Sequence, residues 1–236
     1  MIKHLEWDSE FFGFPVGIVK ILSEPDWKNF IIEYGDLFSR YKLIYFITDE
    51  ALVIPNRILE RYNGHYINQR ILYRKAIKQS HIILPASIEE YTDPKLTPEF
   101  LQLAYTSGSF SRFKIDQNMP DGKFGELYKI WIQNSLDKKI ADKVFVSTHN
   151  NKISAMVSCK DTGTVCNIGL VAVGASEQGK GTGRFLIKKV EEHAYNSGLK
   201  EVRVPTQSNN INACNFYEKL GFISIETTNY YHFWIK

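Results

Sequence analysis

The sequence predicts an α/β fold, because short apolar runs of strand length alternate along its 236 residues with segments of helical period. Hydrophobic residues make up 44% of the chain and aromatic residues 14%, enough to fill one large domain or two small ones. Between Pro85 and Pro98 the composition turns to Pro, Thr, Asp and Glu, as is typical of a domain boundary. We therefore expect a smaller N-terminal α/β domain over residues 1–88 and a second domain over residues 89–236.

The N-terminal part contains two rounds of strand and helix. Apolar runs predict strands at residues 16–22 and 43–47, with a helix between them from residue 26 to residue 40. A second helix is expected to begin at Pro55. The alternating residues 67–77 predict a third strand.

The second part begins with a helix signal. Thr97-Pro98-Glu99 has the residue types of a helix N-terminus, and residues 100–105 continue the helix. Residues 107–120 have no regular period and are expected to form a loop. A further helix over residues 126–136 precedes a predicted hairpin, in which strands 143–148 and 153–159 flank the turn Asn150-Asn151.

The charges are nearly balanced, with 29 Lys and Arg against 26 Asp and Glu and a net charge of +3. This balance argues against a nucleic-acid binder and is compatible with a small anionic ligand. The N-terminus lacks the pattern of a secretory signal, and no apolar run is long enough to span a membrane. We expect a cytoplasmic protein without membrane association, and the sequence leaves a homodimer open.

The three cysteines are Cys159, Cys166 and Cys214. They form no Cys-x-x-Cys pair, and no histidine stands at a metal-motif spacing from them. We expect small core residues and no metal site.

A glycine-rich loop carries the main functional signal. It follows the apolar strand 167–173, contains four glycines between Gly174 and Gly183, and precedes an amphipathic helix that ends near Gly198. Glycines allow close approach of the backbone, and a helix N-terminus favours negative charge. The segment therefore predicts a phosphate-binding loop.

Three types of phosphate loop compete for this segment, and a plain turn between strand and helix also fits it. The dinucleotide motif Gly-x-Gly-x-x-Gly fits poorly, because the loop has Gly179-x-Gly181-x-Gly183. The nucleoside triphosphate motif needs a magnesium-binding hydroxyl where Gly181 stands. The third type is Gln-x-x-Gly-x-Gly after an apolar strand, which begins at Gln178.

A second motif follows, Asn210-x-x-Ala213-x-x-Phe216-Tyr217-x-x-x-Gly221-Phe222, with a predicted strand at Val202-Arg203-Val204 before it. Asn209 or Asn210 can cap the short helix, and Gly221 can end it. The two motifs together resemble the GNAT acetyltransferase superfamily. The resemblance implies a mixed, mostly antiparallel sheet flanked by helices, and acetyl-CoA as co-substrate.

The resemblance also implies site residues. The residues expected to bind acetyl-CoA are Val171, Ala172, Val173, Gln178, Gly179, Lys180, Gly181, Thr182, Gly183, Asn210 and Ala213. Tyr217 is expected to protonate the departing thiolate, although an aromatic core residue would fit its position as well. A backbone N–H near Val171 can stabilise the oxyanion during direct transfer. Cys214 as a nucleophile is the rival, but no base partner is visible for it.

The acceptor is indicated by three segments outside these motifs. Residues 5–13, containing Trp7-Asp8-Ser9-Glu10-Phe11-Phe12-Gly13, resemble the N-terminal signature of the dTDP-fucosamine acetyltransferase family. Residues 109–116 and 231–234 resemble the loop and the last strand of that family. The resemblance implies a dTDP- or UDP-linked amino sugar as acceptor and a role in surface polysaccharide synthesis. Acetylation of a peptide amine and acyl-CoA binding without catalysis are the alternatives.

Three residues of the loop are expected to bind the substrate. Arg112 can contact a diphosphate, Phe113 can stack on a base or sugar, and Asp116 lies beside them. Asp116 and His232 are candidate bases, with a water chain as the alternative, so the base stays unassigned. The family pattern has an Asp-Pro step where this chain has residues 114–118, which leaves the sugar, the position of its amine and the nucleotide open.

Overall fold

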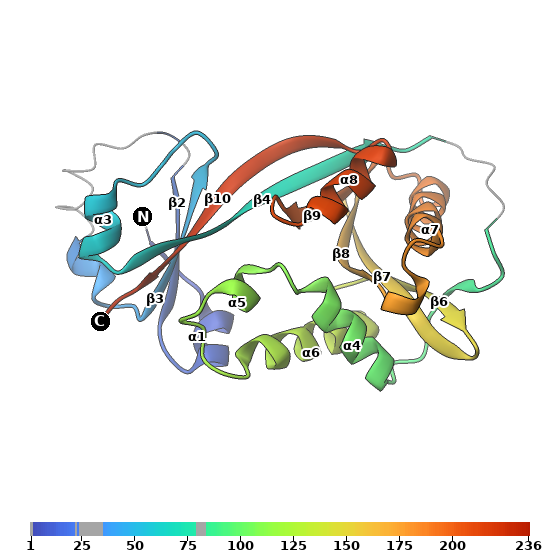
Figure 1. Cartoon of the computed structure of the whole chain (residues 1–236), viewed down its shortest axis with the longest axis horizontal. Helices are drawn as coiled ribbons and strands as arrows, with labels where there is room; N and C mark the ends of the chain where they lie inside the picture. Colours follow the sequence, from blue (N-terminus) through green and yellow to red (C-terminus); the bar gives the residue numbers. More distant parts are fainter. Residues whose placement is uncertain (1, 22, 24–34, 79–83) are drawn as a thin grey trace.

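The computed structural model describes residues 2–21, 23, 35–78 and 84–236. In this part of the chain ten strands form one sheet in the order β1-β2-β3-β10-β4-β9-β8-β7-β6-β5 (Figure 1). Only the neighbours β2–β3 and β8–β9 are parallel, so the predicted mixed, mostly antiparallel sheet is confirmed. The strands are β1 (Lys3–His4), β2 (Val16–Ile21), β3 (Leu43–Asp49), β4 (Gly64–Ala76), β5 (Ile88–Glu90), β6 (Lys143–His149), β7 (Lys152–Thr162), β8 (Val165–Val173), β9 (Glu201–Gln207) and β10 (Ile223–Trp234).

Helices cover both faces of the sheet. One face of β6 to β9 is covered by α7, and α4 packs on the opposite face, where α6 packs on α4. None of the described helices is long and apolar enough to cross a membrane. The helices are α1 (Glu6–Phe12), α3 (Asn56–Arg61), α4 (Pro98–Ser107), α5 (Arg112–Ile115), α6 (Lys123–Leu136), the 3₁₀ turn η1 (Ala175–Glu177), α7 (Thr182–Asn196) and α8 (Ile211–Lys219).

Most predicted elements correspond to observed ones. The hairpin turn Asn150-Asn151 has positive φ angles at both residues, 50° and 59°, as a tight turn between twisted strands requires. Thr97 caps α4, because its side chain accepts a hydrogen bond from the backbone N–H of Phe100. The helix expected at residues 26–40 is helical over residues 35–38, and its residues 26–34, together with Leu22 of the first strand, lie outside the described residues.

The prediction of a continuous loop over residues 107–120 is wrong. The segment contains the short helix α5, which places Phe113 against Trp131 and Tyr45. A single helical turn is too short to give a detectable period, and burial of Phe113 stabilises it. Helix α6 also begins three residues earlier than expected, at Lys123.

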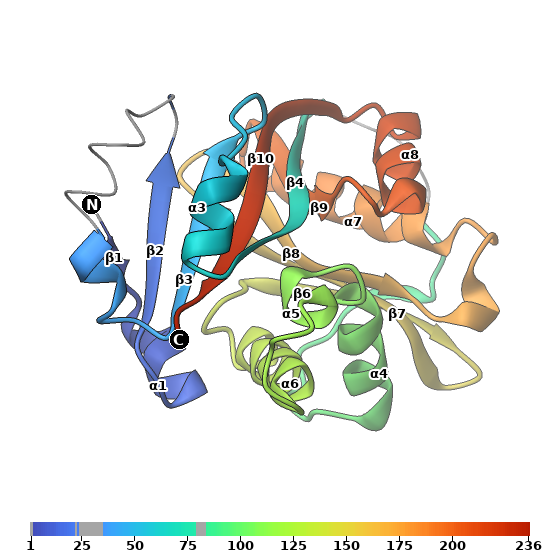
Figure 2. The same cartoon turned by 60° about the vertical axis from the view of Figure 1, so that its left-hand side comes forward.

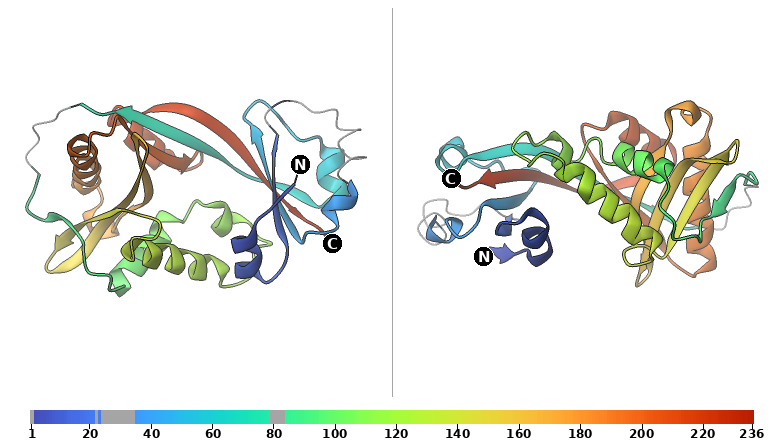
Figure 3. Two further views of the ribbon diagram at one scale, coloured as in Figure 1. Left: turned by 180° about the vertical axis from the view of Figure 1, so that it is seen from behind. Right: turned by 90° about the horizontal axis from the view of Figure 1, so that it is seen from below.

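Strand β10 links the two ends of the chain. It pairs with β3 on one side and β4 on the other, and β4 pairs in turn with β9. The views in Figures 2 and 3 show the long strands β4 and β10 running from the N-terminal part to the part that carries α7 and α8. The division into domains of residues 1–88 and 89–236 stays a prediction. In the sheet, β10 of the second range lies between β3 and β4 of the first.

A bulge in β8 opens the sheet. Val157 of β7 pairs with Val171 and Cys159 pairs with Ile168, so β8 has one residue more than β7 between these pairs. The extra residue reverses the alternation of side chains, so Ile168 and Val171 face the same core cluster. Parallel pairing of β8 with β9 is limited to residues 165–167 and 201–203. The two strands therefore separate towards their carboxyl ends.

Candidate active site

A cleft of about 1290 Å³ opens where β8 and β9 separate. Residues of α4, α5 and α6 line one side, and residues of β9 and α8 line the other. Strand β8 and the loop before α7 contribute the rest of the wall. Of the predicted site residues, thirteen line this one cleft: Arg112, Phe113, Val171, Ala172, Val173, Gln178, Gly179, Gly181, Thr182, Gly183, Asn210, Ala213 and Tyr217.

The glycine-rich loop brings the N-terminus of α7 to the cleft. Gly179 and Gly181 have φ angles of 77° and 85°, which residues with a side chain rarely adopt. Gly181 is the N-cap residue of α7, and it makes no side-chain hydrogen bond to the N–H groups of the first turn. The first N–H groups of a helix have no partner within the helix and, together with the helix dipole, favour an anion at this end.

The side chains of the loop are held by local contacts. The amide of Gln178 donates a hydrogen bond to the carbonyl oxygen of Val173 at 3.1 Å. Lys180 does not line the cleft, and its ammonium forms an ion pair with Glu177 at 3.0 Å. The expected contribution of Lys180 to cofactor binding can therefore come from its backbone only.

Gly183 sets the distance between α7 and α8. A Cβ atom at this position would lie 3.3 Å from the ring of Phe216 and 3.4 Å from the side chain of Val173. These contacts are tighter than most contacts of a Cβ atom, so a larger residue would push the helix away from the cleft.

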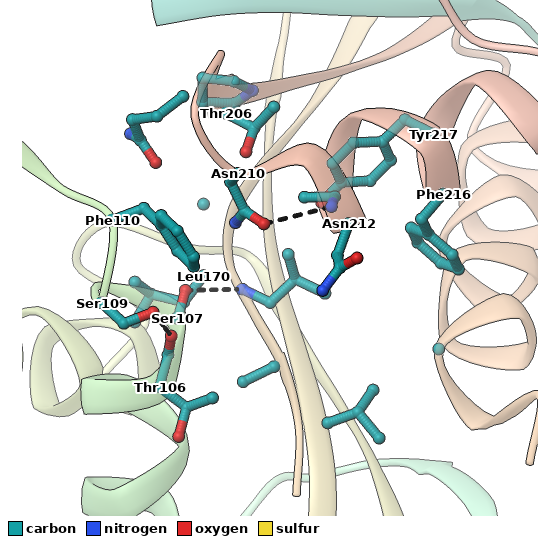
Figure 4. A pocket seen from close by; sticks show the side chains of 18 of the residues that line it. Thr106, Ser107, Ser109, Phe110, Leu170, Thr206, Asn210, Asn212, Phe216 and Tyr217 are labelled. Carbon is teal, nitrogen blue, oxygen red and sulfur yellow. Dashed lines mark hydrogen bonds between the residues drawn. The ribbon is translucent and has the colours of Figure 1, made fainter. Parts of the chain in front are cut away.

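The bulged strand exposes a backbone donor to the cleft. The N–H of Val171 donates to the hydroxyl oxygen of Ser107 at 3.2 Å, as Figure 4 shows. Ser107 is the last residue of α4 and lines the cleft. The N–H of the preceding residue, Leu170, donates to the buried hydroxyl of Ser158 at 2.9 Å. The N–H of Val171 is thus held on the cleft side by a hydroxyl that a ligand oxygen could replace.

Helix α8 places Tyr217 in the cleft wall. Asn210 caps the helix, as its side-chain oxygen accepts from the N–H of Ala213 at 3.2 Å, and Gly221 ends the turn with a φ of 83°. Tyr217 is only 3% exposed, and burial raises the pKa of its hydroxyl above that of a free tyrosine. The hydroxyl therefore stays protonated at neutral pH.

Cys214 is one turn before Tyr217 on the same helix. It does not line the cleft, and its thiol donates to the carbonyl oxygen of Gln207 at 3.6 Å. No described ion pair or hydrogen bond joins it to a base, so its geometry does not favour a nucleophile.

The opposite end of the cleft holds a cation among aromatic rings. The guanidinium carbon of Arg112 lies 4.1 Å from the ring centre of Tyr45 and 5.0 Å from that of Tyr230. It also lies 4.5 Å from the ring centre of Phe113. The rings surround the guanidinium, and the partly buried Asp8 carboxylate is close enough for its charge to interact with that of Arg112.

Asp116, which the sequence predicted to bind the acceptor, does not line the cleft. Asp116 is buried outside the cleft lining, where its carboxylate pairs with His232 at 2.6 Å and accepts from the Trp234 indole at 2.9 Å. Burial alone would raise the pKa of Asp116, but the hydrogen bonds from His232, Asn118 and Trp234 hold it below its usual value. Both candidate bases, Asp116 and His232, are therefore partners of each other and do not line the cleft.

Several cleft residues have no counterpart in the sequence prediction. They include Asn68, Ser107, Phe110, Tyr128, Trp131, Arg184, Asn212 and Tyr230. Phe110, Arg184, Asn212 and Tyr230 lie inside or beside segments that the sequence analysis singled out, whereas the others come from elements far apart in the chain and meet only in the fold.

Known structures show the class of fold. The GCN5-related N-acetyltransferase from Sphaerobacter thermophilus matches 87% of this chain and 67% of its own with a TM-score of 0.58 and 15% identity. A functionally unknown conserved protein from Staphylococcus epidermidis matches 94% of this chain and 85% of its own with a TM-score of 0.61 and 13% identity. The split sheet with a glycine loop at its opening is thus the fold of GNAT-like proteins.

Sequence comparison gives the family. Residues 110–222, which contain both motifs, match the Acetyltransferase (GNAT) family, and this part of the chain is a GNAT acetyltransferase domain. The chain is 25% identical to dTDP-fucosamine acetyltransferase of Escherichia coli O6:H1 over 98% of its length and 96% of that protein. It is 26% identical to the spore coat polysaccharide biosynthesis protein SpsD of Bacillus subtilis over 60% of its length, and spans 49% of SpsD.

Proposed function

We propose that the protein transfers the acetyl group of acetyl-CoA to the amine of a nucleotide-linked amino-deoxy sugar, of the dTDP-4-amino-4,6-dideoxyhexose type. One observation carries this proposal: a single cleft is lined both by the predicted acetyl-CoA residues and by Arg112 and Phe113. The full-length similarity to a dTDP-fucosamine acetyltransferase supports the choice of acceptor.

The donor end fits a pyrophosphate. The first turn of α7 supplies N–H groups at Thr182 and Gly183, and Gly181 leaves space before them. Arg184 also lines the cleft and adds positive charge, whereas the ammonium of Lys188 pairs with Glu191 at 2.6 Å. The first turn of α7 and Arg184 bind the pyrophosphate of coenzyme A in the proposed complex.

The chemistry needs few groups from the chain. The neutral amine attacks the thioester carbon, a C–N bond forms, and the C–S bond then breaks. The N–H of Val171 exchanges its hydrogen bond to Ser107 for one to the oxyanion and so stabilises the oxyanion. The protonated hydroxyl of Tyr217 then gives its proton to the leaving thiolate. The amine proton passes to water, since neither Asp116 nor His232 lines the cleft, and water returns a proton to the Tyr217 phenolate before the next turnover.

The acceptor end fits a nucleotide diphosphate sugar. Arg112 offers a forked cation to the diphosphate, and its aromatic neighbours Tyr230 and Phe113 also line the cleft. The cleft of about 1290 Å³ is larger than the roughly 300–1,000 Å³ that is usual for one small ligand. It has room for a donor and an acceptor together.

An acetyl-transfer assay tests the proposal. The purified protein is given acetyl-CoA with a panel of dTDP- and UDP-linked amino sugars, with polyamines and an N-terminal peptide as controls, and free thiol is measured. We expect thiol release that depends on an amino sugar nucleotide. Thiol release with the peptide and with no amino sugar would contradict the proposed acceptor. Binding of the coenzyme without thiol release on any amine would indicate a non-catalytic acyl-CoA-binding protein.

A further inference from the structure

Four metal-ligating side chains meet between the sheet and helix α7, outside the lining of the cleft. They are Cys159 and Asp161 of β7, Cys166 of β8 and His193 of α7, and their ligand atoms all lie within 4.8 Å of one another. Antiparallel pairing places Asp161 opposite Cys166, and Cys159 lies two residues further along the same face of β7. None of the four lines the cleft.

All three cysteines are buried, as expected, but Cys159 and Cys166 lie beside a carboxylate and a histidine, which the sequence did not indicate. No short motif joins the four residues, because His193 follows Cys166 only after the glycine loop and most of α7. The pairing of β7 with β8 and the packing of α7 on both strands bring them together. Cys214 stays outside the cluster.

Two features of the cluster point to a missing ligand. Oδ1 of Asp161 is buried and has no hydrogen-bond partner among the described residues, while Oδ2 lies 2.9 Å from Nε2 of His193. Both cysteines are at most 1% exposed and belong to the apolar core under α7, where Asp161 and His193 bring polar ligand atoms within 4.8 Å of the two thiols. A buried carboxylate oxygen without a partner is costly, and a cation would satisfy it.

We propose that Cys159, Asp161, Cys166 and His193 bind a zinc ion. Two thiolates, one imidazole and one carboxylate form a tetrahedral set that zinc prefers, and four protein ligands close the site to substrate. On binding, two Zn–S bonds form and the two S–H protons pass to solvent. Because both thiols must lose their protons to bind the ion, metal uptake weakens as the pH falls.

The surroundings favour a structural site. Asp142 accepts a hydrogen bond from the backbone N–H of Asp161 at 2.8 Å and pairs with Lys160 at 2.6 Å, which fixes this part of β7. The side chains of His193 and Asp161 are 13% and 27% exposed, so an ion can enter from solvent. Because α7 carries the predicted pyrophosphate site at its other end, zinc at His193 would anchor this helix to the sheet.

Metal analysis of the whole protein tests the proposal. The wild type, Cys166→Ser, His193→Gln and the control Cys214→Ser are loaded with Zn²⁺ or Co²⁺ and dialysed, and circular dichroism checks that each is folded. We expect one ion per chain in the wild type and in Cys214→Ser, and a loss of affinity of at least about tenfold in the other two. Co²⁺ should give a thiolate charge-transfer band and the visible bands of a tetrahedral site.

A second measurement does not depend on the folding of the ligand variants. In Cys214→Ser only Cys159 and Cys166 remain, and Zn²⁺ should protect both thiols from alkylation and raise the unfolding temperature. The proposal is overturned if the wild type retains no metal, or if Cys166→Ser and His193→Gln bind it like the wild type. A disulfide between Cys159 and Cys166 in the protein purified without reductant would also overturn it.

Discussion

Asp116 accepts a hydrogen bond from Nδ1–H of His232 over 2.6 Å, and the side chains of both residues are almost completely buried. Because the carboxylate is ionised, Nδ1 must carry the proton, and Nε2 of His232 is left without a partner among the described residues. The pair joins the segment after α5 to strand β10. Burial lowers the pKa of His232 to about 4, so the ring is neutral in the folded protein.

This pair predicts a loss of stability in weak acid. Between the pKa of an unfolded histidine, about 6.5, and that of His232 in the fold, about 4, the unfolded chain binds more protons. The free energy of unfolding should therefore fall as the pH is lowered through this window, by roughly 3 kcal/mol in total from this residue. Urea unfolding of the wild type and of His232→Gln measures it, since glutamine can still donate to Asp116.

The control is His149→Gln, which replaces an exposed histidine. It should keep the pH dependence of the wild type, while His232→Gln should lose the part that belongs to the window between pH 6.5 and 4. An unchanged dependence in His232→Gln would show that the histidine does not cause the loss.

The buried hydroxyl of Tyr217 predicts a catalytic effect without a binding effect. Tyr217→Phe keeps the ring in the wall of the cleft and removes only the proton donor. Turnover should fall at least about tenfold, while the affinity for acetyl-CoA stays nearly the same. Steady-state kinetics and calorimetric titration with coenzyme A measure the two quantities.

Tyr73→Phe is the matched control. Tyr73 is also buried, its ring centre lies 5.9 Å from that of Tyr217, and its hydroxyl donates to Glu218 outside the cleft lining. This change should lower stability more than turnover. Equal turnover in Tyr217→Phe and the wild type would remove Tyr217 from catalysis.

Local signals made the donor end predictable. The left-handed φ of Gly181, the cap by Asn210 and the left-handed stop at Gly221 each follow from one residue type at one position. The acceptor end was less predictable, because its geometry depends on contacts between distant segments. Arg112 meets the rings of Tyr45 in β3 and Tyr230 in β10, two strands far from it in the sequence.

The same reasoning explains what was missed in the fold. Strand β10 could be expected at the end of the chain, but nothing in its sequence shows that it lies between β3 and β4. Helix α5 is too short for a period, and packing of Phe113 stabilises it. The cysteines appeared isolated because their partner His193 comes from a helix that packs across the sheet.

The left-handed backbone at Gly181 predicts that a side chain there prevents coenzyme binding. Gly181→Asp places a carboxylate beside the predicted pyrophosphate site and strains a φ of 85°. Binding of coenzyme A should fall below detection in calorimetry. Gly163→Asp is the control, because Gly163 also has a positive φ, 59°, but lies in the turn between β7 and β8, outside the cleft lining. Retained affinity in Gly181→Asp would contradict the loop assignment.

The rings around Arg112 predict that its shape matters as well as its charge. Arg112→Lys keeps a positive charge but loses the planar fork that stacks between Tyr45 and Tyr230. The KM for the nucleotide sugar should rise about tenfold or more, since a charge-assisted hydrogen bond is lost, while the KM for acetyl-CoA stays unchanged. Lys114→Ala removes a neighbouring cation that does not line the cleft and should leave both constants unchanged. If the two variants raise the KM for the nucleotide sugar equally, general electrostatics and not the fork of Arg112 accounts for acceptor binding.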